Sequence, residues 1–451
     1  IVSTTTIASN QEHSVHETEL TYSKVTWKLV PLLLVCYVMA YLDRINVGFA
    51  QLQMKSELAF SDTVYGLGAG IFFVGYFLFE VPSNLLLEKV GARLTLLRIM
   101  FVWGLLSAGM AFITSPTMFY IMRFLLGVAE AGFFPGVILY LTYWFPGSRR
   151  ARIIAMFMSG IAIAGVLGGP ISGWIMNDMA GVSGLSGWQW MFILEGLPST
   201  FLGIFVYFYL VDRPEDAKWL TSNEKRILRH HLDVERADDP MPHHGTGKRH
   251  SVWEAFKDPK VYVLSFSYFC FICGVYVISF WLPTFIKGMG VKSLLDVGLL
   301  SAIPYGITAI GMVLIGRHSD LKRERRWHCA IPAFLGALAL VAMVHTPTTN
   351  MPLGLLCLTL ASLGIITTMP IFWSIPTAYL RDSAAAGGIA FINSLGLVGG
   401  FVSPFLLGWI KTTTGSLSMG LYVMAGIMIV GGLTVLIAVP ANLLHEHSEL
   451  E

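Results

Sequence analysis

The chain has 451 residues, of which 55% are apolar and only 13% are charged, and its formal net charge is +2. A soluble domain carries about 25% charged residues, so this composition, with a mean hydropathy of +0.65, excludes a soluble globular protein and predicts an integral membrane protein. The low net charge, without basic patches interleaved with aromatic residues, excludes a nucleic-acid partner.

Twelve segments are long and apolar enough to cross a bilayer, since a spanning helix needs about 20 residues. The expected spans are 28–50, 64–87, 93–113, 117–143, 152–176, 190–211, 258–284, 295–316, 327–345, 351–379, 385–409 and 417–440. A long polar stretch, 212–257, divides them into six and six. The sequence therefore predicts an all-α membrane protein with a tail (1–27), a bundle (28–211), a linker (212–257), a second bundle (258–440) and a second tail (441–451).

Lys and Arg residues are distributed unevenly over the connections between these spans. Most lie in the two tails, the linker and the connections on the same side, and four lie on the opposite side: Lys55, Lys287, Lys292 and Lys411. The positive-inside rule then predicts a multi-pass plasma-membrane protein, in a bacterium the inner membrane, with both termini in the cytoplasm. The linker also contains LTSNEKRILRHHLDVE, whose cap and apolar spacing predict an amphipathic helix at the membrane surface.

Four charged residues lie inside two of the spans: Asp43 and Arg44 in the first, Arg123 and Glu130 in the fourth. Each costs about 2.5–3.5 kcal/mol at a helix centre and usually marks a partner or a pathway. In the stretch AYLDRINVG, Tyr41 and Arg44 share one face of a helix, whereas Asp43 projects about 100° away. Arg123 and Glu130 share a face two turns apart. We predict cross-helix pairs of Asp43 with Arg123 and of Arg44 with Glu130.

These pairs have two interpretations, and the residues alone leave both open. The four charges are either structural ion pairs that fix helix packing or parts of a transport site. Buried pairs contribute little net stability, because desolvation offsets attraction. A buried carboxylate that can lose its Arg partner is suited to carry a proton, while Arg itself stays protonated.

Short motifs repeat between the two halves and resemble a known superfamily. The connections NLLLEKVGARLTL and LIGRHSDLKRERRW each combine a Gly, an acidic residue and a basic cluster, as expected of two related bundles that move against each other. With RFLLGVAEAGFFPG in the fourth span and GVLGGPISG in the fifth, the chain resembles a major facilitator superfamily transporter. YLDRINVGFA, FLFEVPSNLLLEKVGAR and GWQWMFILEGLPS are similar to the anion:cation symporter family, which includes tartrate, phthalate, hydroxyphenylacetate and aldonate permeases.

The resemblance implies a fold of two pseudo-symmetric six-helix bundles and a function. It implies a monomeric, proton-coupled symporter that imports a small organic carboxylate by alternating access, with the proton as coupling ion and no other cofactor. The family roles fall on four matching residues, with Arg44 on the substrate and Glu130, Asp43 and Arg123 in proton coupling. Our hypothesis adds Tyr41 and Tyr76 beside Arg44 at the substrate carboxylate.

The second half supplies further candidates for the substrate pocket. In TTMPIFWSIPTAYL, Trp373 and Ser374 lie between two prolines, which a helix at membrane depth tolerates where it lines a cavity. Asn393 is the amide of the eleventh span, where exposure to lipid is costly. Resemblance to the family places these three positions in the pocket. Tyr276 is a further candidate, although aromatic core packing explains it equally well.

Other features of the sequence narrow the function. Glu80 and Glu195 are also acids within spans, and we interpret them as structural or gating hydrogen-bond partners. No H-E-x-x-H, G-x-S-x-G or other nucleophile motif is present, so we predict neither an enzyme nor a metal site. The alternatives to a symporter are an organic-anion exchanger or exporter of the same fold and a membrane sensor that does not transport.

Overall fold

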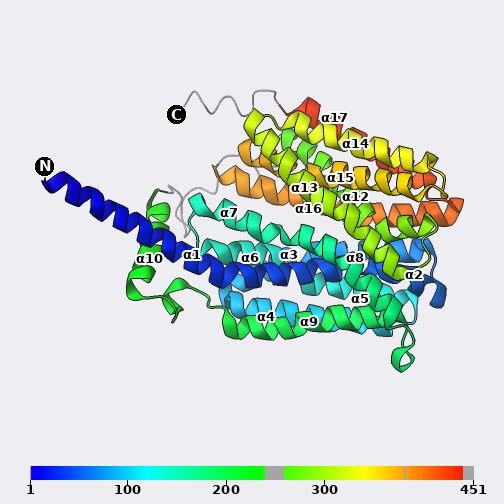
Figure 1. Cartoon of the computed structure of the whole chain (residues 1–451), viewed down its shortest axis with the longest axis horizontal. Helices are drawn as coiled ribbons and strands as arrows, with labels where there is room; N and C mark the ends of the chain where they lie inside the picture. The colour runs from blue at the N-terminus through cyan, green and yellow to red at the C-terminus, as the bar shows by residue number, and fades with distance from the viewer. Residues whose placement is uncertain (1, 239–257, 380–381, 440–451) are drawn as a thin grey trace.

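The computed structural model describes residues 2–238, 258–379 and 382–439. This part of the chain contains twelve helical segments that are long and apolar enough to cross a membrane. The twelve predicted spans are therefore confirmed. Figure 1 shows them as two stacked groups of helices, with the first half of the chain in one group and the second half in the other.

The helices of the first half include three spans that are interrupted. The first span is formed by α1 (Val2–Ile45) and α2 (Val47–Glu57), the fourth by α5 (Pro116–Glu130) and α6 (Phe133–Thr142), and the fifth by α7 (Gly147–Met158) and α8 (Gly160–Asp178). The others are continuous: α3 (Asp62–Val90), α4 (Ala92–Gly109) and α9 (Gly187–Tyr209). Between α5 and α6, Gly132 has φ +86°, a left-handed conformation that glycine adopts readily because it lacks a Cβ. Glu130 therefore ends a helix inside the membrane span.

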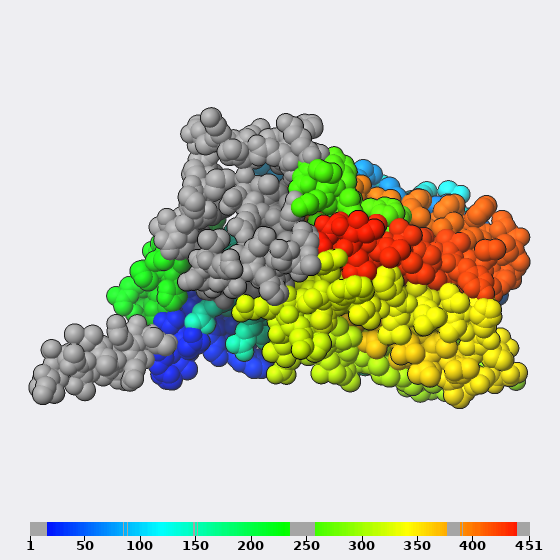
Figure 2. All heavy atoms as spheres, turned by 90° about the horizontal axis from the view of Figure 1, so that it is seen from above, coloured from blue at the N-terminus to red at the C-terminus, as the bar shows by residue number. Residues whose placement is uncertain are grey.

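In the second half, each span is one continuous helix. The helices are α12 (Pro259–Gly288), α13 (Leu294–Lys322), α14 (Arg326–His345), α15 (Met351–Tyr379), α16 (Asp382–Thr414) and α17 (Ser418–Ala438). Figure 2 shows α17 lying beside α14 on one face of this half.

Most of the predicted tail, 1–27, is helical. Residues 2–27 continue the first span as one helix, α1, because no helix-breaking residue separates the polar segment from the apolar one. The predicted linker helix is present as α10 (Ser222–Asp238), and it packs against α1. Lys24 Nζ lies 2.9 Å from Glu224 Oε1, and Tyr22 Oη lies 3.1 Å from His231 Nδ1. The last residues of the predicted tail and α10 of the linker thus pack together at one end of the molecule (Figure 1).

We call this end, with α10 and the start of α1, the linker side, and the opposite end, with residues 58–61 and 289–293, the far side. The two bundles contact each other most closely in the far half. A Cβ at Gly298 of α13 would lie 2.1 Å from the carbonyl oxygen of Gly169 of α8. Thr412 Oγ1 of α16 accepts from the Thr63 amide of α3 at 2.9 Å. Such close backbone contact closes the far side.

Candidate functional site

An ion pair between the first and fourth spans is the centre of the candidate site. Arg44, at the end of α1, pairs with Glu130, the last residue of α5. The Glu130 side chain is 1% exposed and that of Arg44 is 14% exposed. The pair is the one predicted from the sequence. Arg44 Nε and Glu130 Oε2 have no hydrogen-bond partner among the described residues, so each partner retains capacity for another ligand.

Aromatic rings surround the Arg44 guanidinium. Its Cζ lies 5.5 Å from the ring centroids of Tyr76 and Phe72 and 6.0 Å from that of Tyr41, distances at which a cation is attracted to the face of a ring. From the other bundle, the Tyr276 hydroxyl on α12 faces Arg44. The structure therefore brings together Arg44 and the three predicted tyrosines, and both bundles contribute to this surround.

The predicted pair of Asp43 with Arg123 is wrong in this structure. Asp43 is 1% exposed and accepts three hydrogen bonds from uncharged donors. Its Oδ2 accepts from Trp103 Nε1 at 2.6 Å and from Ser199 Oγ at 2.9 Å, and its Oδ1 accepts from Ser107 Oγ at 2.8 Å. The face of α1 that carries Asp43 packs on α4 and α9, which supply these donors, whereas Arg123 lies on α5.

Arg123 finds its partners on α3 instead. Its side chain is fully buried, and its Nε donates to the Gly68 carbonyl at 3.2 Å and its Nη2 to the Ala69 carbonyl at 3.4 Å. The guanidinium carbon also lies 5.0 Å from the Phe72 ring centroid. Phe72 thus lies against both Arg123 and Arg44.

The candidates of the second half occupy the other bundle. Trp373 Nε1 donates to Tyr268 Oη at 3.3 Å, and their ring centroids lie 4.9 Å apart. Ser374 Oγ donates to the Ile371 carbonyl of its own helix at 2.6 Å. Tyr276 packs on Phe73 of the first bundle, with ring centroids 4.3 Å apart. Asn393 is half-buried on α16, and no described contact joins it to the Arg44 cluster.

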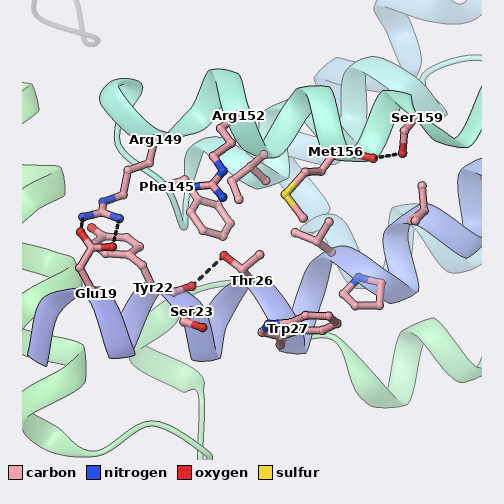
Figure 3. Close-up of a pocket in the computed structure, with 14 residues that line it drawn as sticks. Glu19, Tyr22, Ser23, Thr26, Trp27, Phe145, Arg149, Arg152, Met156 and Ser159 are labelled. Atoms are coloured by element: carbon pink, nitrogen blue, oxygen red, sulfur yellow. Dashed lines mark hydrogen bonds and ion pairs between the residues drawn. The ribbon is translucent and has the colours of Figure 1, made fainter. Parts of the chain in front are cut away.

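A separate groove of about 910 Å³ lies between α1 and α7 on the linker side (Figure 3). Arg149 pairs with Glu19 at one end, and Arg152 points toward the groove beside Phe145. Trp27 is 76% exposed at its edge. None of the site residues predicted from the sequence lines this groove. From the sequence, these arginines indicated only which side of the membrane faces the cytoplasm. Their position beside α1 depends on how α1 and α7 pack, which the sequence does not show.

The Arg44 cluster has the chemistry to exchange one anion for another. A buried guanidinium held by a single carboxylate can accept a second carboxylate if the first takes up a proton, because the net charge of the site then stays the same. The rings of Tyr41, Tyr76 and Tyr276 offer apolar surface and hydroxyl groups next to it. Because the Arg44 cluster lies between the two bundles, movement of one bundle relative to the other changes the access to this site.

Residues 33–404 match the profile of the Major Facilitator Superfamily. The chain is 46% identical over 445 residues to a putative metabolite transport protein, NicT, of Pseudomonas putida, which covers 99% of both chains. It is 48% identical over 414 residues to a putative tartrate transporter of Agrobacterium vitis, covering 92% of this chain and 90% of that one.

Solved structures show the same fold at lower identity. The inward open conformation of the xylose transporter XylE from E. coli superposes with a TM-score of 0.73 at 15% identity, covering 94% of this chain and 99% of that one. At this identity the likeness concerns the fold alone.

Proposed function

This chain belongs to the Major Facilitator Superfamily, and we propose that it is a proton-coupled symporter that imports a small organic carboxylate by alternating access. As a member of this superfamily, it is a multi-pass membrane transporter and not an enzyme. We propose further that the linker side and both termini face the cytoplasm, in agreement with the positive-inside rule, and that the protein acts as a monomer in a bacterial inner membrane.

The Arg44–Glu130 pair is the observation on which this proposal rests. In the proposed cycle, the substrate carboxylate binds Arg44 and displaces Glu130, which takes up a proton. Tyr41, Tyr76 and Tyr276 contact the body of the substrate. Because a deprotonated Glu130 competes with the substrate for Arg44, binding of the anion and uptake of the proton become linked.

Asp43 is a second candidate for a coupling proton, although its partners differ from the expected ones. It is buried among neutral donors, from Trp103, Ser107 and Ser199, and no cation bonds to it among the described residues. A buried carboxylate without a cation is costly in its charged form. The role of Arg123 is then structural support for α3 and the ring of Phe72, with an indirect effect on coupling.

Tartrate is the first substrate to test, because a relative that is 48% identical carries that name. A hydroxy acid of this kind also offers two carboxylates for Arg44 and hydroxyl groups for the surrounding tyrosines. Other small carboxylates, with aromatic or sugar groups, belong in the same screen.

The experiment is uptake of labelled tartrate into liposomes that contain the purified protein. We expect accumulation against a gradient when the outside is more acidic. Glu130→Gln should retain exchange of tartrate between the two sides and lose accumulation, whereas Arg44→Ala should lose both. Asp178→Asn, which alters an exposed carboxylate on α8, is the matched control and should behave as the wild type.

Other outcomes support the alternative functions. Accumulation that requires the opposite gradient indicates an exporter, and exchange that no pH gradient can drive uphill indicates an anion exchanger. Binding without exchange indicates a sensor. If Glu130→Gln accumulates tartrate as well as the wild type does, Glu130 is not the coupling residue.

A further inference from the structure

Glu195 on α9 is a buried carboxyl that the proposed transport reaction does not use. Its side chain is 3% exposed. Its Oε1 accepts a hydrogen bond from Ser172 Oγ of α8 at 2.7 Å, and its Oε2 has no partner among the described residues. The Asn46 amide, in the break between α1 and α2, lies near the Glu195 carboxyl but outside hydrogen-bond geometry.

Within the part of the chain that the structure describes, the elements around α9 offer no cation to Glu195. Its charged neighbour among the described residues is Asp43 on α1, which has the same sign. The other elements contribute neutral groups: Ser172 on α8 and Asn46 beside α2. On α4, Ser107 and Gly104 face Gly196, the residue after Glu195. Burial near a like charge disfavours the ionised carboxyl, whereas the neutral acid can keep the Ser172 bond and donate from its other oxygen.

Glu195 and Asp43 are held by the same stretch of α9. Ser199, one turn after Glu195, donates to Asp43. The two carboxyls therefore belong to one buried polar network that joins α1, α4, α8 and α9. This network and the Arg44–Glu130 pair lie on different faces of α1.

The hydrogen bond to Ser172 reaches the contact between the two bundles. Ser172 lies between Gly169 and Gly173 of α8. A Cβ at Gly169 would lie 2.5 Å from the Gly298 carbonyl oxygen of α13, and a Cβ at Gly173 would lie 2.6 Å from that of Leu294. Glu195 thus holds, from inside the first bundle, the turn of α8 that closes the far side.

We propose that Glu195 is a proton-binding positioning residue, separate from Glu130, whose proton stabilises the closed contact between α8 and α13. When the far side is open, a proton from that side binds the carboxylate of Glu195. The neutral acid keeps α8 in place through Ser172, and the contact with Gly298 forms. When the proton leaves, the negative charges of Glu195 and Asp43 repel each other and the charged Glu195 carboxylate draws in water, so the turn of α8 loosens.

The role of Glu195 in a transport cycle rests on the proposed function, but the test of its effect on the α8–α13 contact needs no substrate. Ser301 of α13 is fully buried, and a Cβ at Gly169 would lie 2.8 Å from its Cβ. A Ser301→Cys variant is therefore protected from a water-soluble maleimide while the contact is closed. The five native cysteines are all buried, and labelling of the parent protein gives the background.

The rate of labelling is measured in detergent at mildly acidic and mildly alkaline pH, and each rate is divided by the rate for the same variant unfolded in denaturant at the same pH. This ratio removes the faster reaction of every thiol at high pH, where more thiolate is present, and the rates compared below are these ratios. With Ser301→Cys alone, we expect faster labelling at alkaline pH, where Glu195 loses its proton. Adding Glu195→Gln, a neutral isostere, should give slow labelling at both pH values. Adding Glu195→Ala or Ser172→Ala should raise the rate at both, by about tenfold for the loss of one buried hydrogen bond. Glu130→Gln should leave the pH dependence in place.

Three results would overturn the proposal. The first is an unchanged pH dependence in Glu195→Gln. The second is a pH dependence that Asp43→Asn removes and Glu195→Gln retains, which would assign the proton to Asp43. The third is slow labelling in both Glu195→Ala and Ser172→Ala, which would separate Glu195 from the contact. Failure of uptake with every small carboxylate in the screen would contradict the proposed function, and each of these labelling outcomes would still test the role of Glu195.

Discussion

Asp43 and Arg44 are adjacent in the sequence, yet they bind partners on different sides of α1. Arg44 pairs with Glu130 of α5, next to rings from both bundles, whereas Asp43 accepts hydrogen bonds from α4 and α9 inside the first bundle. One helix thus connects an exchangeable ion pair to an enclosed polar network. A rotation of α1 that changes one of these sites changes the other.

Removal of one partner of the ion pair should destabilise the protein strongly. Arg44→Ala leaves Glu130 buried without its cation, and breaking a buried pair costs about 3–5 kcal/mol. The double variant Arg44→Ala/Glu130→Gln removes the uncompensated charge and should recover much of this loss. Thermal unfolding in detergent measures both. As a control, Arg229→Ala breaks an exposed pair with Glu215 and should cost at most about 1 kcal/mol. Equal losses for Arg44→Ala and Arg229→Ala would contradict the buried pair.

The indole of Trp103 should matter for its hydrogen bond as well as for its volume. Trp103→Phe removes the donor to Asp43, and an unsatisfied buried group costs about 1–3 kcal/mol. Trp281→Phe is the matched control, because Trp281 is also fully buried but its Nε1 has no partner among the described residues. We expect a lower melting temperature for Trp103→Phe than for Trp281→Phe. Indistinguishable melting curves would show that the indole bond contributes nothing.

A methyl group at Gly298 should force the far side open. The added Cβ would lie 2.1 Å from the Gly169 carbonyl oxygen, so the bundles must separate. Gly316→Ala on the same helix meets nothing within 4 Å and serves as the control, with a small gain of about 0.5–1 kcal/mol from helix propensity. Maleimide labelling of Ser301→Cys should accelerate in Gly298→Ala and stay slow in Gly316→Ala. A slow rate in both would argue against this contact as the closing element.

Docking of α10 on α1 should weaken as the pH falls. Burial lowers the pKa of His231, with smaller contributions from His230 and Arg149. A lowered pKa means that docking favours the neutral ring, so its stabilisation is complete above the pKa of the undocked ring, about 6.5. It is lost as the pH falls through the lower pKa of the docked ring.

Hydrogen exchange of the α10 amides measures this equilibrium. Exchange should speed up on acidification in the wild type, and His231→Gln should reduce this response. His230→Gln, at an exposed neighbouring position, should keep most of it. A response that persists in full in His231→Gln would assign the pH dependence to another group.

Much of the fold follows from the sequence because the composition of each segment shows whether lipid or water surrounds it. The apolar length of each segment predicted the twelve spans, and the polar stretch at 212–257 predicted the division into two halves. Helix breaks were harder to foresee. Asn46 and Ala131 interrupt the first and fourth spans, and an apolar count is blind to such breaks, because the neighbouring helices stabilise them.

The candidate site was only partly predictable for a similar reason. Helical spacing placed Asp43 and Arg44 on different faces and Arg123 and Glu130 on a common one. This spacing was sufficient to predict the Arg44–Glu130 pair, because an unpaired charge at membrane depth is costly and opposite charges there tend to pair. It was not enough for Asp43, whose donors are an indole and two hydroxyls. Trp103, Ser107 and Ser199 look like ordinary core residues in the sequence.

By itself, the sequence determined that the chain crosses the membrane twelve times and that four charges lie within two of the spans, because the cost of charge in lipid restricts where such residues can be. Only the tertiary structure decided which partner each charge has and which turn of α8 lies against Gly298. Those relationships depend on helices that are distant in the sequence, and the same helical face can meet several different neighbours. The pattern along one helix fixes a direction, and packing fixes what lies in that direction.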